Sequence, residues 1–114
     1  MTTIKVSESI EAMRVSLEVN GHSGYAEPGK DIICSAVSIL TYTTAQLVCE
    51  MNAYGKLSEP PTVNLSDGDA VIEARCRDDN AFHEARKIIH FAKAGYSLLQ
   101  NTYPEYIKFV INEA

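Results

Sequence analysis

The sequence predicts an α+β fold in which two long amphipathic helices and a mostly antiparallel sheet form a sandwich. Two observations predict it. Short segments alternate apolar and polar residues, which indicates strands, because successive side chains of a strand point to opposite faces. Two longer segments repeat apolar residues at helical spacing. In chain order the elements are β-β-α-β-β-α-β, and one face of the sheet gives both helices a surface to cover.

The first two elements are strands. Alternation over residues 4–7 predicts a short strand, and residues 8–12 form a polar connection. The clearest alternation of the chain covers residues 13–19, where one face is apolar and the other polar. Asn20 and Gly21 end this strand.

The first long helix is predicted from Asp31 to about Asn52. Asp31 is a good N-cap, and Gly55 is a plausible stop. Apolar residues at helical spacing form the stripe expected to be buried: Ile33, Val37, Leu40, Thr44, Leu47 and Met51. Ile32, Ala36 and Ile39 widen that stripe, so we expect the early helix to be buried on much of its girth.

The second half repeats the pattern. Strands at residues 62–65 and 70–77 flank the turn signal Asp67-Gly68, and Cys76 falls on the apolar face of the second strand. A helix follows from Ala81 to about Asn101, and residues 106–111 form a last strand. The apolar stripe of this helix comprises Phe82, Ala85, Ile88, Ile89, Ala92, Leu98 and Leu99.

Length and composition exclude several classes of function. A chain of 114 residues predicts one domain over residues 1–114. The net charge is −5 and no basic stripe is present, so we expect no direct binding to nucleic acid. No apolar run approaches the length that crosses a bilayer, and the N-terminus has no apolar signal region, so no membrane contact is expected. Three widely spaced cysteines suggest a reducing cytoplasm.

Cys34 and His22 are the candidate catalytic residues. Cys34 lies three residues after the N-cap Asp31, in a first helical turn, where the helix dipole favours a thiolate. His22 follows the strand end and is joined to the helix by a loop long enough to bring the imidazole to the sulfur. A cysteine with a histidine in reach is the minimum for covalent acyl transfer. The alternative is a small core cysteine and an ordinary loop histidine.

The neighbouring residues have supporting roles in this hypothesis. Asp31 either only caps the helix or also orients His22, and backbone N–H groups at the helix start would hold an oxyanion. We expect the Ser38 hydroxyl to bond a carbonyl four residues back. The loop 23–30 is either a connector or a loose lid over the nucleophile. His83, Glu84 and His90 do not assemble a metal site, and no cofactor is expected.

The motif around the candidate nucleophile resembles the ribosomal-processing cysteine protease family, Prp. The matching residues are Gly21-His22-x-x-Tyr25 and, without a gap, Gly29-Lys-Asp31-Ile-Ile-Cys34-x-x-Val37-Ser38. The Asp-Gly hairpin at Gly68 and the run from Tyr103 to Tyr106 also look similar. Gly24, Tyr25 and Gly29 then belong to the lid loop, and Gly21 precedes the histidine. Ser35, where alanine is common in the family, is a small departure.

The resemblance implies a function and partners. Members of the family trim a short N-terminal extension from a large-subunit ribosomal protein, after an apolar stretch that ends in Phe. Some relatives are carried by bacteriophages, where capsid or scaffold proteins bear similar extensions. The resemblance also implies the same architecture and a homodimer. No cofactor is implied, since Cys–His chemistry needs none. Two alternatives stay open: a non-catalytic dimeric module that binds a ribosomal protein, and a Cys–His acyltransferase.

Overall fold

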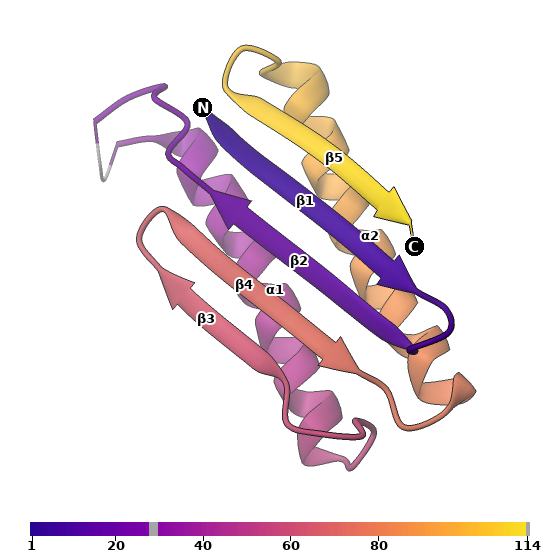
Figure 1. Cartoon of the computed structure of the whole chain (residues 1–114). Helices are drawn as coiled ribbons and strands as arrows, with labels where there is room; N and C mark the ends of the chain where they lie inside the picture. Colours follow the sequence, from indigo (N-terminus) through magenta and orange to yellow (C-terminus); the bar gives the residue numbers. More distant parts are fainter. Residues whose placement is uncertain (28–29, 114) are drawn as a thin grey trace.

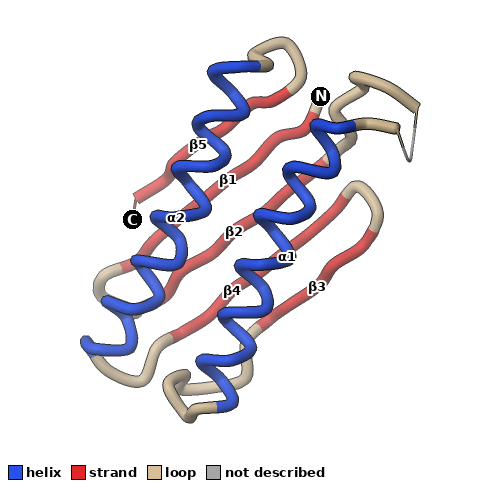
Figure 2. Tube along the Cα trace, turned by 180° about the vertical axis from the view of Figure 1, so that it is seen from behind, coloured by secondary structure: helices blue, strands red, loops and turns tan. Residues whose placement is uncertain are grey.

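The computed structural model, which describes residues 1–27 and 30–113, places both helices on one face of a five-stranded sheet (Figures 1 and 2). The elements are β1 (Thr2–Ser9), β2 (Arg14–Asn20), α1 (Ile32–Ala53), β3 (Thr62–Ser66), β4 (Asp69–Arg75), α2 (Asp79–Thr102) and β5 (Ile107–Glu113). This order and the α+β architecture confirm the prediction.

The strand order of the sheet positions the site. It is β3-β4-β2-β1-β5, with every neighbouring pair antiparallel except β1 and β5, which run parallel. Because β2 pairs with β4, Asn20 at the end of β2 lies opposite Asp69 at the start of β4. The segment after β2 therefore emerges beside the β3–β4 turn, next to the N-terminal end of α1 (Figure 1).

The core lies between the sheet and the two helices, as the alternation predicts. Each central strand turns alternate residues toward the helices, and the buried ones include Ile4, Val6, Val15, Leu17, Ile72 and Ala74. Tyr96 of α2 is fully buried and was absent from the predicted stripe, because tyrosine is a borderline core residue. Its hydroxyl lies 2.8 Å from the hydroxyl of Thr41 on α1, which satisfies both groups.

The helices are less enclosed than the sequence suggests. Ile32 and Ile39 of α1 are 56% and 66% exposed, and Leu98 of α2 is 68% exposed, so their predicted burial is wrong. The physical reason is that the sheet covers only one side of each helix (Figure 2). By length and composition alone, α1 is long and apolar enough to cross a membrane, whereas no such segment was predicted from the sequence. Helices that pack in a protein core share that property, and α1 packs on the sheet through its buried side.

The predicted polar connection after the first strand is wrong at Glu8. This residue belongs to β1 and its side chain is buried. The carboxylate accepts hydrogen bonds from the Arg86 guanidinium at 3.1 Å and the Lys93 ammonium at 3.4 Å, both from α2. A buried charge needs such partners, so Glu8 ties the strand to the helix.

Candidate active site

His22 is held at the end of β2 by a tightly bonded glycine. The Gly21 N–H donates to the Gly68 carbonyl at 2.7 Å, and the Thr2 hydroxyl donates to the Gly21 carbonyl at 3.3 Å. Gly21 has a φ of +87°, and a Cβ on it would lie 2.6 Å from the Met1 carbonyl oxygen. Only glycine fits both conditions. The backbone that carries His22 is thus fixed to the β3–β4 turn and to the N-terminus.

Cys34 lies in the first turn of α1 and is half-buried. Its Sγ accepts a hydrogen bond from the backbone N–H of Ser23 at 3.5 Å, and the Ser23 hydroxyl lies 3.7 Å away. The residue directly after His22 therefore touches the thiol. The segment after His22 therefore lies against the start of α1, a proximity that the length of the loop allows.

Asp31 connects the loop to the helix through its carboxylate. Oδ1 accepts the N–H groups of Ile33 and Cys34, each at 3.0 Å. Oδ2 accepts the hydroxyl of Ser23 and, at 3.3 Å, the N–H of Ala26. Asp31 is thus the N-cap of α1 and the anchor of the loop. Among the described residues its bonds go to these four groups and not to His22.

These bonds explain the acidity of Asp31. Burial alone would raise the pKa of a carboxyl that is 5% exposed. The hydrogen bonds from Ser23, Cys34 and Ala26 outweigh burial and lower the pKa of Asp31 from 3.8 to about 2. The folded state therefore favours the carboxylate. This stabilisation is present above pH 3.8 and is lost as pH falls toward 2.

We expect Asp31→Asn to destabilise the fold at pH 7 by roughly 2 kcal/mol, the equivalent of the depressed pKa. Asn can still cap the helix with its oxygen, but its NH2 group faces the Ala26 N–H, which then lacks an acceptor. Urea unfolding at pH 7 and pH 2.5 measures the difference, which should shrink at the lower pH. Asp78→Asn is the matched control, because Asp78 caps α2 from a less buried position. Equal losses in both variants would contradict this account.

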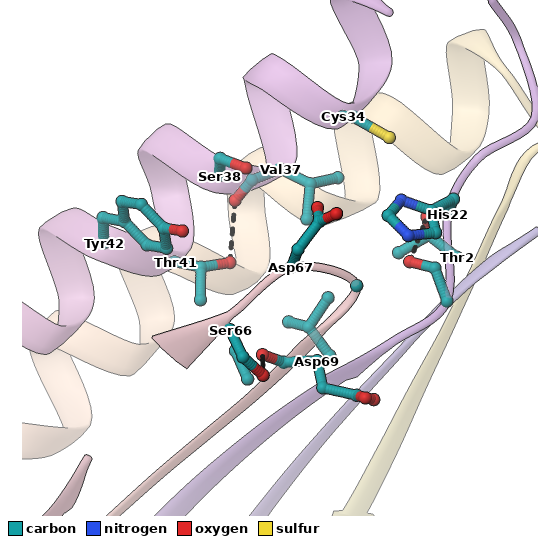
Figure 3. Close-up of a pocket in the computed structure, with 14 residues that line it drawn as sticks. Thr2, His22, Cys34, Val37, Ser38, Thr41, Tyr42, Ser66, Asp67 and Asp69 are labelled. Atoms are coloured by element: carbon teal, nitrogen blue, oxygen red, sulfur yellow. Dashed lines mark hydrogen bonds between the residues drawn. The ribbon is translucent and has the colours of Figure 1, made fainter. Parts of the chain in front are cut away.

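Two adjoining pockets form one cleft between α1, the loop and the β3–β4 turn, and Figure 3 shows one of them. Five residues line both pockets: His22, Cys34, Ser38, Tyr42 and Asp67. The structure thus brings the predicted histidine and cysteine into one cleft, with no hydrogen bond between them among the described residues. Catalytic hydrogen bonds in free enzymes are often long and shorten when substrate binds. Tyr42 and Asp67 were missed, because neither is adjacent in sequence to the Cys–His motif.

Two expectations about the helix start are not met. The N–H groups of Ile33, Cys34 and Ser35 all donate to Asp31, so they are not open to an oxyanion. Asp31, the N-cap of the helix that carries Cys34, accepts the hydrogen bonds of all three N–H groups. The Ser38 hydroxyl makes no bond to the Cys34 carbonyl within residues 1–27 and 30–113. That pattern occurs instead at Ser35, whose hydroxyl donates to the Asp31 carbonyl at 3.1 Å.

The loop between His22 and Asp31 is more anchored than its polar composition suggests. Ser23 is 2% exposed and its hydroxyl is bonded to Asp31. The Tyr25 ring packs edge-on against Tyr103 at 5.9 Å and Tyr106 at 5.4 Å between ring centroids. These contacts attach the loop to the segment that enters β5. Gly24 lies in this loop and lines the cleft, whereas Gly29 lies outside the described residues.

The other two cysteines lie outside the cleft and in contrasting environments. Cys49 is exposed on α1. Cys76 is 1% exposed, which confirms its assignment to the core, and burial together with nearby Asp78 and Glu84 raises the pKa of its thiol to about 11. Of the three thiols, only Cys34 shares a cleft with a histidine. Within the described chain, no group of three or more potential ligands is placed to hold a metal ion.

The arrangement has the parts of a thiol nucleophile site. A thiol in a first helical turn accepts a backbone N–H, and an imidazole lines the same cleft. Ile39 and Tyr42 give one side of that cleft an apolar, exposed surface, where an extended peptide would find contacts. The chemistry that such a cleft supports is acyl transfer through a thioester.

Comparisons with known proteins show which family and which solved structures this chain is similar to. The family model described as "Cysteine protease Prp" matches residues 1–108. The ribosomal processing cysteine protease Prp of Staphylococcus aureus (strain Mu50 / ATCC 700699) is 24% identical over 108 residues, which are 95% of this chain and 96% of that protein. A crystal structure of Prp from S. aureus with a covalently linked product peptide has a TM-score of 0.74 at 23% identity, covering 98% of this chain and 100% of that one. Another, with a substrate peptide, has a TM-score of 0.64 at 23% identity and covers 100% of both chains.

Proposed function

The chain belongs to the cysteine protease Prp family and is a cysteine protease, and we propose that it trims an N-terminal extension from a bacterial large-subunit ribosomal protein. The alternative substrate in this proposal is a phage capsid or scaffold protein that carries a similar cleavage site. The observation that supports the proposal most is the shared cleft of His22 and Cys34, with the Ser23 N–H on the sulfur. The relatives solved with a product or substrate peptide support a peptide as the occupant. We also propose a cytoplasmic homodimer.

The reaction that we propose begins with proton transfer. His22 takes the proton of the Cys34 thiol, and the thiolate attacks the carbonyl carbon of the scissile peptide bond. The C–N bond breaks as His22 returns the proton to the leaving amine, which leaves a thioester on Cys34. Water, deprotonated by His22, then attacks the thioester carbon, the C–S bond breaks, and His22 returns the proton to the Cys34 sulfur. The Ser23 N–H stabilises the thiolate before it attacks and as it departs, since it already donates to Sγ at 3.5 Å.

Asp31 supports this site without touching the substrate. Its carboxylate holds Ser23 and the first turn of α1, which are the two elements that contact or carry the sulfur. Gly21 supports His22 in the same way, through its bonds to Gly68 and Thr2. Ser38 lies one turn beyond Cys34 and lines the cleft, where we propose that its hydroxyl contacts the bound peptide.

We propose that the loop 23–30, with Gly24, Tyr25 and Gly29, closes over the bound peptide and excludes water from the thiolate. Tyr25→Ala removes the contacts with Tyr103 and Tyr106, so we expect faster hydrogen exchange at amides 23–27 and a loss of roughly ten- to hundredfold in kcat/KM. Tyr54→Ala is the control, because Tyr54 is an exposed tyrosine at the far end of α1. Amides 23–27 should slow further when a substrate-like peptide binds the Cys34→Ala variant. Equal exchange with and without that peptide would reduce the loop to a connector.

The direct test of this function is incubation with a ribosomal-protein precursor and with a phage capsid precursor, followed by intact mass measurement. We expect one shortened product that has lost its N-terminal extension. An unchanged mass for both precursors, with binding retained, would favour a non-catalytic module. Transfer of the acyl fragment to an added amine, in place of hydrolysis, would identify an acyltransferase.

A further inference from the structure

The imidazole ring of His22 faces the β3–β4 turn with its Nε2 atom. A Cβ added to Gly68 would lie 2.7 Å from Nε2, against 3.2 Å from Cε1 and 3.3 Å from Cδ2. The Nε2 corner of the ring therefore rests on Gly68, where the missing side chain permits the approach. Figure 3 shows one ring nitrogen on the side of the hairpin and the other on the side of α1. Nδ1 is thus the nitrogen available to the Cys34 thiol.

Asp67, the residue before Gly68, has a carboxylate without a hydrogen-bond partner among the described residues. Asp67 rises from the turn into the space between α1 and His22, and it lines both pockets with His22 and Cys34 (Figure 3). Among the described residues its carboxylate accepts no hydrogen bond, whereas both oxygens of Asp31 are occupied. Asp69, at the other end of the turn, points its carboxylate away from His22 (Figure 3).

From this geometry we infer that Asp67 is a positioning residue for His22, and this inference rests on the proposed Cys34–His22 chemistry. A carboxylate that accepts the Nε2–H bond fixes the tautomer in which Nδ1 is free to take the thiol proton. It also stabilises the imidazolium that forms when the thiolate does. The two side chains form no ion pair in this structure. This role requires the exposed Asp67 side chain to change rotamer and reach Nε2, which lies against the neighbouring Gly68.

Other ionisable groups around His22 do not take this role. Cys34 and Tyr42 line the cleft from α1, on the side of the nucleophile. Asp31 lines it from the loop but is bonded to Ser23, Ala26 and the start of α1. From the hairpin, Asp67 lines both pockets beside the imidazole, whereas Asp69 lines one of them and points its carboxylate away from His22. The turn therefore supplies a third side chain to a site whose first two members come from the segment after β2 and from α1.

The test measures the pH dependence of Cys34 alkylation by iodoacetamide in a Cys49→Ala background, where the exposed thiol of Cys49 is removed. Asp67→Asn removes the charge that stabilises the imidazolium–thiolate pair. We expect the acid limb of the rate profile to move up by about one pH unit, so that alkylation at pH 6 slows about tenfold. At pH 9.5 and above the rate should be unchanged, because the thiolate then forms without the pair. Asp67→Glu should restore the profile in part.

Asp69→Asn is the matched control, since it removes the same charge from the same turn but points away from the imidazole. A shift of equal size in Asp69→Asn, or none in Asp67→Asn, would overturn the inference. Cleavage of the precursor by the unsubstituted enzyme is measured in parallel. If the unsubstituted enzyme cleaves no precursor, the proposed substrate is wrong. The pH dependence of Cys34 alkylation in the Asp67 and Asp69 variants then still decides the role of Asp67. If the unsubstituted enzyme cleaves the precursor, and Asp67→Asn and Asp69→Asn have equal kcat/KM at every pH, the positioning role of Asp67 is wrong while the proposed function stands.

Discussion

Replacing Cys34 with alanine should lower cleavage by at least about ten-thousandfold, because the bond-forming atom is removed and no other thiol lines the described cleft. The fold should persist. Cys34 is half-buried, and the variant loses one weak bond from the Ser23 N–H. We expect a loss of less than about 1 kcal/mol in the free energy of unfolding. Precursor cleavage followed by mass measurement, with urea unfolding on the same samples, checks both expectations.

The other cysteines supply the controls for this prediction. Cys49→Ala should keep full activity, which shows that exposure of a thiol alone confers nothing. Cys76 is buried in the core and the pKa of its thiol is raised to about 11, so it should alkylate last of the three. Residual cleavage by Cys34→Ala at more than about a hundredth of the full rate would reject Cys34 as the nucleophile.

His22→Ala has the second largest expected effect, a loss of about 100- to 10 000-fold in kcat/KM near neutral pH. Without the imidazole, the thiol has no base in the first step and the leaving amine has no proton donor. His22 is exposed and its ring rests on Gly68, so little packing is lost. Steady-state kinetics across pH 5 to 10 measures the loss, and activity should recover in part at high pH, where Cys34 ionises unaided.

His90→Ala is the matched control for His22→Ala, because His90 is an exposed histidine on α2, away from the cleft. It should leave kcat/KM unchanged. An unchanged rate of Cys34 alkylation in His22→Ala at pH 6 to 7, together with undiminished cleavage, would reduce His22 to a loop residue.

The fold was predictable from the sequence wherever one face of an element is buried. Alternation identified the strands that carry Ile4 and Leu17, and helical spacing identified the side of α1 that carries Val37. Errors arose where burial depends on which elements are neighbours. Ile39 is exposed because no element of the described chain covers the outer side of α1, and Glu8 is buried because Arg86 and Lys93 of α2 reach it. Periodicity in one segment carries no information about these partners.

The candidate site was predictable to the extent that its members share one short motif. His22, Asp31 and Cys34 lie within thirteen residues, and cap chemistry placed the thiol at a helix start. The structure adds what sheet pairing brings to the site. Asp67 belongs to a turn that reaches the cleft only because β4 pairs with β2, and Tyr25 is fixed by residues near the C-terminus. Neither proximity leaves a signal in the local sequence.

In the proposed reaction, Cys34 forms a thioester with the acyl part of the cut peptide. Rapid acid quenching of the enzyme with a precursor peptide, followed by intact mass measurement and peptide mapping, detects this intermediate. The account predicts a transient adduct whose mass equals the N-terminal fragment, mapped to the peptide that contains Cys34. The adduct should be absent in Cys34→Ala and unaffected in Cys49→Ala. Turnover of the peptide with no adduct at any time, or with an adduct on Cys49 or Cys76, would contradict the account.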